Sequence, residues 1–243
     1  MIETKNLIKR FGAKTAVNDL SLHIGAGEFY CFLGPNGAGK TTTIKLLTGL
    51  LKPTAGTVII GGHDIEEEPM AAKQLLGYIP DTPFLYEKLT GREFMRFVAG
   101  LYRVPEETAA KHSEELLELF EIRDVGDELI EGYSHGMRQK LSFASCFLHE
   151  PKIVVVDEPW VGLDPKNIRF VKNFLREKTR DGMTIFMSTH SLSVIEEAAD
   201  RIGIIHNGRL LHTGSLSKIK ALSRNPGSLE DVFLELTNSE AAP

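Results

Sequence analysis

The sequence has few cysteines, a single tryptophan and no long apolar run. The two cysteines, Cys31 and Cys146, both have apolar neighbours, and nothing in the chain has the spacing of a zinc site. We therefore expect buried free thiols in a reducing compartment. No stretch approaches the roughly 20 apolar residues that span a bilayer, and residues 1–5 lack the apolar core of a signal peptide. We expect a soluble, cytoplasmic chain that reaches a membrane only through a partner.

An excess of positive charge is also absent. The net charge is -5, with 25% charged and 42% hydrophobic residues, which is ordinary globular composition. This balance excludes a general attraction to nucleic acid or anionic lipid. The 243 residues are enough for one domain with a sizeable core, or for a core and a small lobe.

Strand patterns occur in the first third of the chain and again after residue 150. Residues 2–11 and 16–24 mix apolar and polar positions, as in an antiparallel pair with one wet face. Later apolar runs favour central parallel strands, and helix-length segments separate them. These runs are 28–33, 153–156, 184–188 and 202–206, with shorter strands expected at 57–60 and 77–79 and a hairpin at 208–213. A helix is expected over 42–51.

The middle of the chain has a helical pattern instead. Thr90 and Glu93 have capping-box spacing, Pro105 suits a first helical turn, and 136–148 repeats apolar residues at helical intervals. The prediction is an α/β P-loop fold: a mainly parallel sheet, an antiparallel β subdomain and an inserted helical subdomain. We place the core at about 1–81 and 151–215 and the helical subdomain at about 82–150. The helical tail then covers about 216–243, after a break at 223–227.

A phosphate-binding loop is the strongest chemical signal. The pattern G-x-x-x-x-G-K-[ST] follows an apolar strand and precedes a helical pattern, which is the context this motif requires. Its backbone amides surround an anion, the helix N-terminus favours negative charge, Lys40 reaches the β- and γ-phosphates, and the Thr41 hydroxyl ligates Mg²⁺. The predicted nucleotide contacts are Gly34, Pro35, Asn36, Gly37, Ala38, Gly39, Lys40, Thr41 and Thr42. The alternative is a glycine-rich turn that binds nothing.

Two acidic residues end a predicted central strand. Asp157 and Glu158 follow Ile153–Val156, at the sheet edge where α/β proteins bind ligands. Asp157 is positioned to hold the metal and Glu158 to polarise an attacking water. The alternative, a pair of solvated carboxylates, weakens once the phosphate loop is considered as well.

These motifs occur in the order found in ATP-binding-cassette (ABC) transporters, and nearly the whole chain resembles their nucleotide-binding subunit. The loop resembles Walker A, and Asp157-Glu158 resembles Walker B with its catalytic glutamate. The segment 133–137, Tyr-Ser-His-Gly-Met, resembles the family signature, usually Leu-Ser-Gly-Gly-Gln. Residues 162–165, Gly-Leu-Asp-Pro, resemble the D-loop, and Ser188-Thr189-His190 carries the switch histidine.

The resemblance implies a role for each of these residues. ATP and Mg²⁺ bind at the loop, and Phe11 stacks on adenine. Two subunits, identical or homologous, pair head to tail, so that Ser134 and Gly136 of one, with Asp164, face the ATP of the other. Lys40, Glu158 and His190 are then catalytic, and Thr41, Asp81 and Asp157 hold the metal. The alternatives are a core phenylalanine for Phe11 and a structural role for His190.

The chain departs from the family pattern at two sites. Asp81 stands where the Q-loop glutamine is usual and offers the metal a charged oxygen in place of an amide. In the signature, His135 replaces a glycine and Met137 a glutamine, which the resemblance implies adds an imidazole side chain beside the partner's nucleotide.

The resemblance also implies a membrane permease as partner, with the ATPase peripheral on the inner face of the cell membrane. We expect the permease to dock around Pro83 to Arg92, with Phe84, Leu85 and Tyr86 as contacts or, alternatively, as lobe packing. Residues 228–237 resemble the tail of bacterial exporter-type subunits, or form a simple packing helix. The competing hypotheses are a non-transport ABC ATPase acting on ribosomes or nucleic acid, and a nucleotide-binding regulator without turnover. The acidic charge and the single cassette argue against the first, and the presence of Glu158 and His190 argues against the second.

Overall fold

A four-stranded antiparallel sheet forms one layer of the molecule. The computed structural model describes residues 1–160, 163–222 and 229–239. The strand order in this sheet is β2-β1-β4-β5. The strands are β1 (Ile2–Phe11), β2 (Lys14–Ile24), β4 (Ala55–Ile60) and β5 (His63–Asp64). Buried and exposed residues alternate along much of β2, which confirms the expected wet face.

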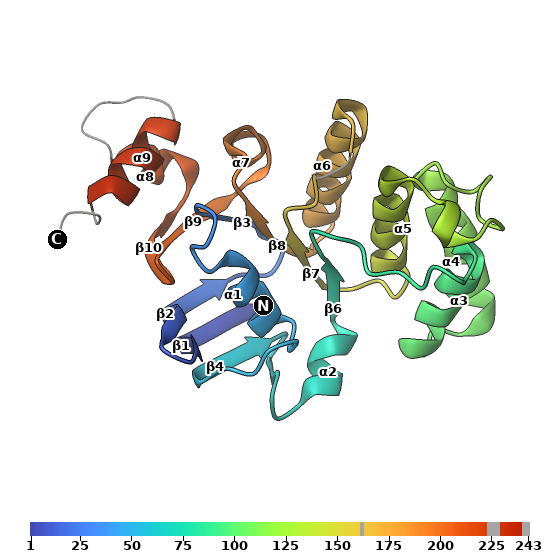
Figure 1. The fold of residues 1–243 in the computed structure, drawn as a ribbon, viewed down its shortest axis with the longest axis horizontal. Helices are drawn as coiled ribbons and strands as arrows, with labels where there is room; N and C mark the ends of the chain where they lie inside the picture. Colours follow the sequence, from blue (N-terminus) through green and yellow to red (C-terminus); the bar gives the residue numbers. More distant parts are fainter. Residues whose placement is uncertain (161–162, 223–228, 240–243) are drawn as a thin grey trace.

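A six-stranded, mostly parallel sheet lies beside it (Figure 1), in the order β10-β9-β3-β8-β7-β6. Its strands are β3 (Phe29–Leu33), β6 (Leu76–Ile79), β7 (Ile153–Asp157), β8 (Thr184–Thr189), β9 (Arg201–His206) and β10 (Arg209–Gly214). Every residue of β3, β7 and β8 is buried, as the unbroken apolar runs predicted. The hairpin between β9 and β10 turns at Asn207 and Gly208, both with positive φ, one residue before the expected turn.

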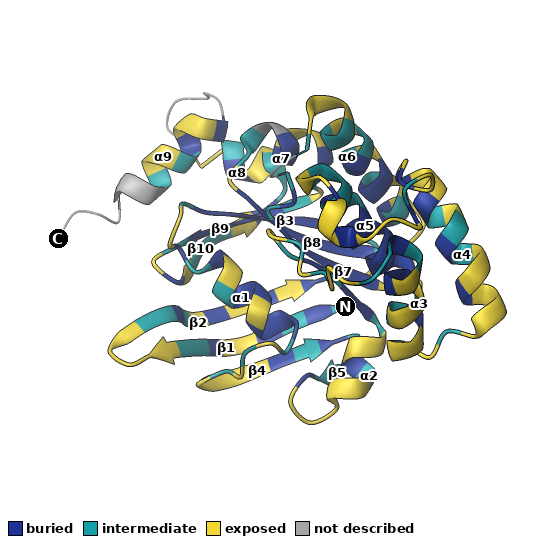
Figure 2. Ribbon diagram, turned by 45° about the vertical axis from the view of Figure 1, so that its right-hand side comes forward, coloured by how far each residue is buried: buried dark blue, intermediate teal, exposed yellow. Residues whose placement is uncertain are grey.

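Helices cover both faces of the six-stranded sheet. On one face α1 (Lys40–Leu47) packs between this sheet and the antiparallel sheet, and residues of all three form one core cluster. On the other face α5 (His135–Phe147), α6 (Pro165–Arg180) and α7 (Leu192–Ala198) contribute to a second cluster. Figure 2 shows the strands between these layers as the buried centre of the molecule.

Three helices form the predicted helical segment. They are α3 (Gly91–Leu101), α4 (Glu106–Leu119) and α5, with a short 3₁₀ turn η1 (Ile130–Gly132) before α5. The Thr90–Glu93 capping box is present, and Pro105 immediately precedes α4. Figure 1 shows α3 and α4 at one end of the molecule and the C-terminal helices α8 (Leu216–Lys220) and α9 (Leu229–Ser239) at the other.

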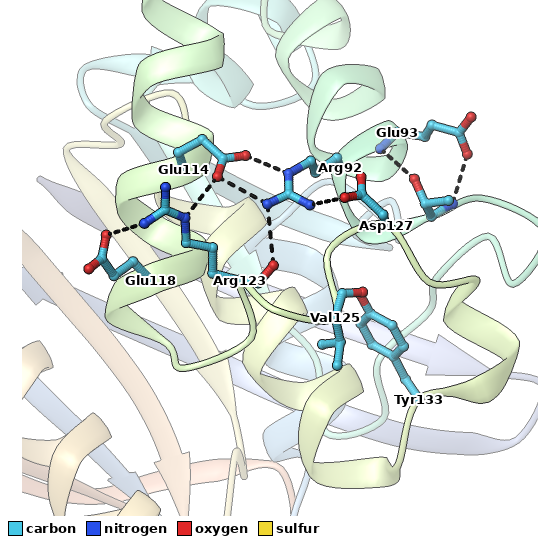
Figure 3. Close-up of polar contacts among 9 residues, drawn as sticks. Arg92, Glu93, Glu114, Glu118, Arg123, Val125, Asp127 and Tyr133 are labelled. Carbon is cyan, nitrogen blue, oxygen red and sulfur yellow. Dashed lines mark hydrogen bonds and ion pairs between the residues drawn. The ribbon is translucent and has the colours of Figure 1, made fainter.

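An arginine network holds the helical segment together (Figure 3). The Arg92 guanidinium on α3 donates to both carboxylate oxygens of Glu114 on α4, at 2.6 and 3.1 Å, and to Asp127 at 2.7 Å. It also donates to the carbonyl oxygen of Arg123. Arg123 in turn pairs with Glu114 and Glu118. These bonds tie the loop after α4 to both helices.

Several boundaries differ from the sequence-based expectation. Helix α1 begins two residues before the predicted Thr42 and ends at Leu47, because Thr48 caps it and Gly49 leaves the helical region at φ 66°. The prediction missed β5 and α2 (Pro69–Gln74), which are too short to show a period. The expected break at 223–227 lies outside the described residues. Among the described helices, none combines the length and apolar character needed to cross a bilayer.

Candidate active site

The predicted phosphate loop connects β3 to α1. Gly39, the N-cap of α1, has φ 109°, and a Cβ there would lie 2.5 Å from the carbonyl oxygen of Ala16. Only glycine fits that position, and the turn it permits leads the chain into the helix. A cavity of about 210 Å³ opens above the loop, lined by its residues together with Lys14, Ala16, Thr41, Thr42 and Glu158. The N-terminus of α1 faces this cavity, which suits an anion.

Lys40 lies under the cavity with only 5% of its surface exposed. Its ammonium donates to the carbonyl oxygens of Gly34 at 2.8 Å and Pro35 at 3.2 Å. It also forms an ion pair with Glu158, at 3.1 Å between Nζ and Oε1. The structure therefore joins the predicted phosphate-binding lysine and the predicted catalytic carboxylate directly.

Glu158 and His190 also meet, because they follow the neighbouring parallel strands β7 and β8. The Nδ1 atom of His190, just after β8, contacts Oε2 of Glu158, just after β7. Glu158 has φ 42°, a conformation that non-glycine residues seldom adopt, and its amide donates to the Ser188 carbonyl at 3.2 Å. The side chains of Lys40, Glu158 and His190 thus form a continuous chain of polar contacts.

Asp157 is fully buried at the end of β7. Burial raises the pKa of its carboxyl group, the hydroxyls of Ser188 and Thr41 act in the opposite direction, and nearby Asp81 and Glu158 raise it further. The Ser188 hydroxyl donates to Oδ1, while Oδ2 has no hydrogen-bond partner. A buried carboxylate oxygen without a partner, close to the Thr41 hydroxyl, fits a divalent cation. Ser188 was not predicted to contribute here, although it is the residue two positions before His190.

Asp81 is exposed just after β6, and its Oδ1 accepts from the Thr82 amide at 2.8 Å. Its effect on the pKa of Asp157 places it near the same sheet edge. In the described part of the chain no three His, Cys, Asp or Glu side chains are grouped to hold a metal by themselves. Magnesium usually needs only one or two carboxylates when phosphate oxygens complete its shell, so this arrangement suits a metal that arrives with a nucleotide.

Phe11 ends β1 beside this cavity. It pairs across the sheet with Lys14, which lines the cavity, and its ring is 48% exposed. The Lys9 ammonium lies 5.2 Å from the ring centroid. The exposure removes the alternative of a core phenylalanine and leaves a flat aromatic face for a planar ligand. Lys14 itself was missed by the sequence reasoning, although it lies three residues after Phe11.

The remaining predicted contacts cap helices away from this cavity. Ser134 is the N-cap of α5, where its hydroxyl accepts from the Met137 amide at 3.2 Å, and Ser134 and His135 are exposed while Gly136 is half-buried. Asp164 is the N-cap of α6, where Oδ1 accepts from the Asn167 amide at 2.9 Å. That backbone hydrogen bond, together with one from the Asn167 side chain, lowers the pKa of Asp164. Gly162 of the expected D-loop lies outside the described residues.

Comparison with known proteins decides the family. Residues 17–161 match the model of the family described as ABC transporter.

The chain belongs to the ABC transporter family.

Relatives of this ABC ATPase match along most of its length. The ABC transporter ATP-binding protein YhcH of Bacillus subtilis (strain 168), itself uncharacterized, is 40% identical, over 87% of this chain and 68% of that protein. The bacitracin transport ATP-binding protein BcrA of Enterococcus faecalis is 38% identical, over 92% of this chain and 72% of that protein. These similarities support the ATP-binding subunit of a transporter over a ribosome- or nucleic-acid-directed ATPase.

Solved structures agree with the fold. An ATP-binding subunit of an ABC transporter superposes with a TM-score of 0.92 at 34% identity, covering 98% of this chain and 99% of that one. A dimeric ATP-binding cassette, MJ0796, solved with ADP and phosphate in a post-hydrolysis state, gives 0.81 at 26% identity over 89% of this chain and 99% of that one. These comparisons confirm the predicted ABC ATPase fold and the predicted binding and hydrolysis of ATP. The dimeric structure also supports the predicted dimer.

Proposed function

We propose that this ABC ATPase powers a separate membrane permease, and that Lys40, Glu158 and His190 carry out the hydrolysis. The observation that carries the proposal is the chain of contacts from Lys40 through Glu158 to His190 beside the phosphate loop. We assign the ammonium to the nucleotide, the carboxylate to the water and the imidazole to the orientation of that carboxylate, and the direct contacts between these side chains support the assignment.

Each side chain then has a role in attack by water on the γ-phosphorus. Lys40 exchanges Glu158 for the β- and γ-phosphate oxygens, and the freed carboxylate accepts a hydrogen bond from the attacking water. The bond from phosphorus to the bridging oxygen breaks, which gives ADP and phosphate. His190 keeps the carboxylate in place through the contact with Oε2. Thr41, Asp157 and Asp81 would hold Mg²⁺, which would neutralise charge on the phosphate oxygens.

The nucleotide contacts follow from the loop. Residues 34–42 surround the phosphates, and Phe11 stacks on the adenine ring. We further propose that two copies, or one copy and a homologue, pair head to tail, so that Ser134, Gly136 and Asp164 approach the partner's ATP. The exposed position of Ser134 at a helix N-terminus, remote from its own loop, supports that arrangement.

We propose that the permease docks on the segment from Pro83 to Arg92. Phe84 is 90% exposed and Tyr86 is 54% exposed, which is unusual for side chains of this size and leaves Phe84 without a packing role. Leu85 instead packs against the core cluster, so its expected contact is not part of this proposal. Docking there makes the chain peripheral on the inner face of the cell membrane.

The division of the chain and the direction of transport are also proposals. Residues 1–81 and 151–215 form the nucleotide-binding core, 82–150 the helical subdomain and 216–243 the tail. Leu229 and Val232 of α9 are buried, which supports the packing role of the tail. We propose export, because residues 228–237 resemble exporter-type subunits and a relative is named for bacitracin transport.

Capture from solubilised membranes tests the permease partner. The tagged chain is expected to retain a polytopic membrane protein, and Phe84→Asp is expected to lose it while keeping ATPase activity. Lys111→Asp, on the exposed face of α4, serves as the matched control and retains the partner. Sedimentation with ribosomes and no membrane protein in the eluate would favour the alternative function instead.

A further inference from the structure

The loop that leads into the signature residue Ser134 is fastened on two sides. On one side the Arg92 network holds the loop at Asp127 and Arg123 (Figure 3). On the same side the Tyr133 hydroxyl donates to the Val125 carbonyl at 2.7 Å. The Tyr133 ring is buried and sits so close to Gly91 that a Cβ there would lie 2.5 Å from its hydroxyl. The loop therefore has little freedom relative to α3.

On the other side the loop is joined to the segment that precedes α3. Thr90 and Leu129 form an isolated antiparallel bridge. The Ile130 amide donates to the Leu89 carbonyl at 2.9 Å, and the Glu131 amide donates to the Glu87 carbonyl at 3.0 Å. Three successive backbone contacts make residues 87–90 and 129–131 a short two-stranded unit, which we call the linker pair. The end at which Glu87 meets Glu131 adjoins the exposed Tyr86 on one strand and leads through Gly132 and Tyr133 to Ser134 on the other.

Arg138 closes this unit from the first turns of α5. Its guanidinium donates from Nη1 to Glu87 Oε1 at 2.6 Å and from Nη2 to the Glu131 carbonyl at 3.0 Å. Its Nε donates to the Tyr133 carbonyl at 3.1 Å. One planar group thus serves a carboxylate and two main-chain acceptors from three separate nitrogens in a fixed fork, a spacing that the single nitrogen of an ammonium does not reproduce.

The number of acceptors separates Arg138 from ordinary surface ion pairs. An exposed pair with one partner contributes little, because solvent competes and side-chain freedom is lost. The Arg138 side chain is 29% exposed, and the carbonyls it satisfies belong to the two residues that flank Gly132. Without it these acceptors lose their partner at the point where the chain enters the signature.

We propose that Arg138 is a positioning residue that locks the linker pair to the N-terminus of α5, so that the docking segment and the signature move as one unit. The inference rests on the proposed function, since it supplies a path from Phe84 and Tyr86 to the surface that closes on the partner's ATP. Arg138 contacts neither nucleotide nor permease in this role. It acts through Tyr133 and Glu131 on the position of Ser134.

The test uses the full chain carrying Glu158→Gln, so that ATP is retained, with Arg138→Met added. Three quantities are measured: ATP affinity at concentrations that keep the chain monomeric, the ATP-driven dimer dissociation constant by sedimentation, and amide hydrogen exchange of Ile130 and Glu131. We expect ATP affinity to stay within about 2-fold, because the loop site is untouched. We expect the dimer dissociation constant and both exchange rates to rise about 10-fold or more.

Matched variants separate positioning from general damage. Arg123→Met removes an arginine with two ion pairs on the far side of the same loop and is expected to dimerise like its parent. Arg138→Lys keeps the ion pair with Glu87 and loses a hydrogen bond to a main-chain carbonyl. Its dimer dissociation constant should therefore lie between those of Arg138→Met and Arg123→Met. Glu87→Gln leaves α5 intact and should weaken the dimer about 3-fold, which keeps the proposal testable if Arg138→Met does not fold.

Two outcomes overturn the proposal, and they can be told apart. If Arg138→Met dimerises like its parent and the two amides stay protected, Arg138 has no positioning role although the proposed function stands. If the parent chain binds ATP but does not dimerise, the head-to-tail arrangement fails, and this inference fails with it.

Discussion

Glu158 is held between the side chains of a lysine and a histidine. Lys40 contacts one of its oxygens and His190 the other, and its backbone sits at a positive φ that costs about 1–3 kcal/mol. Strain of this kind persists where the surrounding structure fixes a residue for a task. For Glu158 that task is to aim a carboxylate at the space above the phosphate loop.

The Glu158→Gln variant tests this assignment. The amide keeps the size of the side chain but cannot accept the proton or orient water in the same way, so turnover is expected to fall roughly 10²–10⁴-fold while ATP still binds. Phosphate release over a single turnover, with nucleotide affinity measured in parallel, checks it. Full activity of the variant would remove Glu158 from its role.

His149 offers a second prediction at the scale of one residue. It stacks on Tyr102, with ring centroids 3.5 Å apart, and a ring nitrogen lies 3.2 Å from the Leu76 carbonyl. Burial lowers its pKa to about 4, although the backbone hydrogen bond acts in the opposite direction. The unfolded chain therefore binds a proton near pH 6.5 that the folded chain does not, and stability falls as pH drops from about 6.5 to 4.

Titration of His149 by NMR checks this value directly, since its ring signals should stay those of neutral imidazole at pH 5.5. A His149→Gln variant should lose part of the acid dependence of the unfolding free energy. A midpoint near 6.5 for His149 would contradict the predicted burial effect.

At the scale of elements, the Arg92 network decides how α3 and α4 meet the following loop. One guanidinium bonds two carboxylates and a main-chain carbonyl. Arg92→Met leaves Glu114, Asp127 and that carbonyl with fewer partners, so the free energy of unfolding is expected to drop by about 1–3 kcal/mol. Urea denaturation checks it, with Lys111→Met as the control.

Lys111 forms a single exposed pair with Glu115 at 3.8 Å, so its replacement should change the unfolding free energy by less than about 0.5 kcal/mol. Equal losses for the two variants would mean that the network adds nothing beyond an ordinary surface pair.

Elements with a strong period or a motif were predictable, and short ones were not. The runs that became β3, β7 and β8 are apolar throughout, because both faces of each strand are covered. Helix α2 has six residues and lies after three exposed glutamates, so no apolar face marks it. The helical segment was recognised from the Thr90–Glu93 capping box and the pattern of α5, while the arginine network within it has no sequence signature.

The candidate site was predictable for a different reason. The phosphate loop and the acidic strand end are local patterns whose spacing follows from the chemistry, and parallel strands bring their carboxyl ends to one edge. What the sequence could not show is which of these side chains touch. The contact of Glu158 with Lys40, and that of Ser188 with Asp157, join residues more than 30 positions apart.

At the scale of the whole molecule, the phosphate loop and Ser134 belong to different parts of the fold. The loop leads into α1, which packs between the two sheets, whereas Ser134 begins α5 in the helical segment (Figure 1), as the proposed head-to-tail pairing requires. Burial raises the pKa of both free thiols, Cys31 and Cys146, which keeps them protonated and unreactive, as the sequence predicted for buried cysteines.

Dimerisation is the prediction at this scale. The Glu158→Gln chain with ATP is expected to sediment as a dimer, and to return to a monomer when ATP is replaced by ADP, because the proposed pairing puts the γ-phosphate between the loop of one copy and the Ser134 of the other. Analytical ultracentrifugation checks it. A monomer under both conditions would contradict the head-to-tail arrangement.

Isothermal titration of the purified chain with ATP, with and without Mg²⁺, tests the central claim most directly. The account predicts saturable binding that depends on Mg²⁺ and is lost in Lys40→Ala, whose thermal melt should show that it is still folded. Binding that is absent in the parent chain, or unchanged in Lys40→Ala, would contradict it.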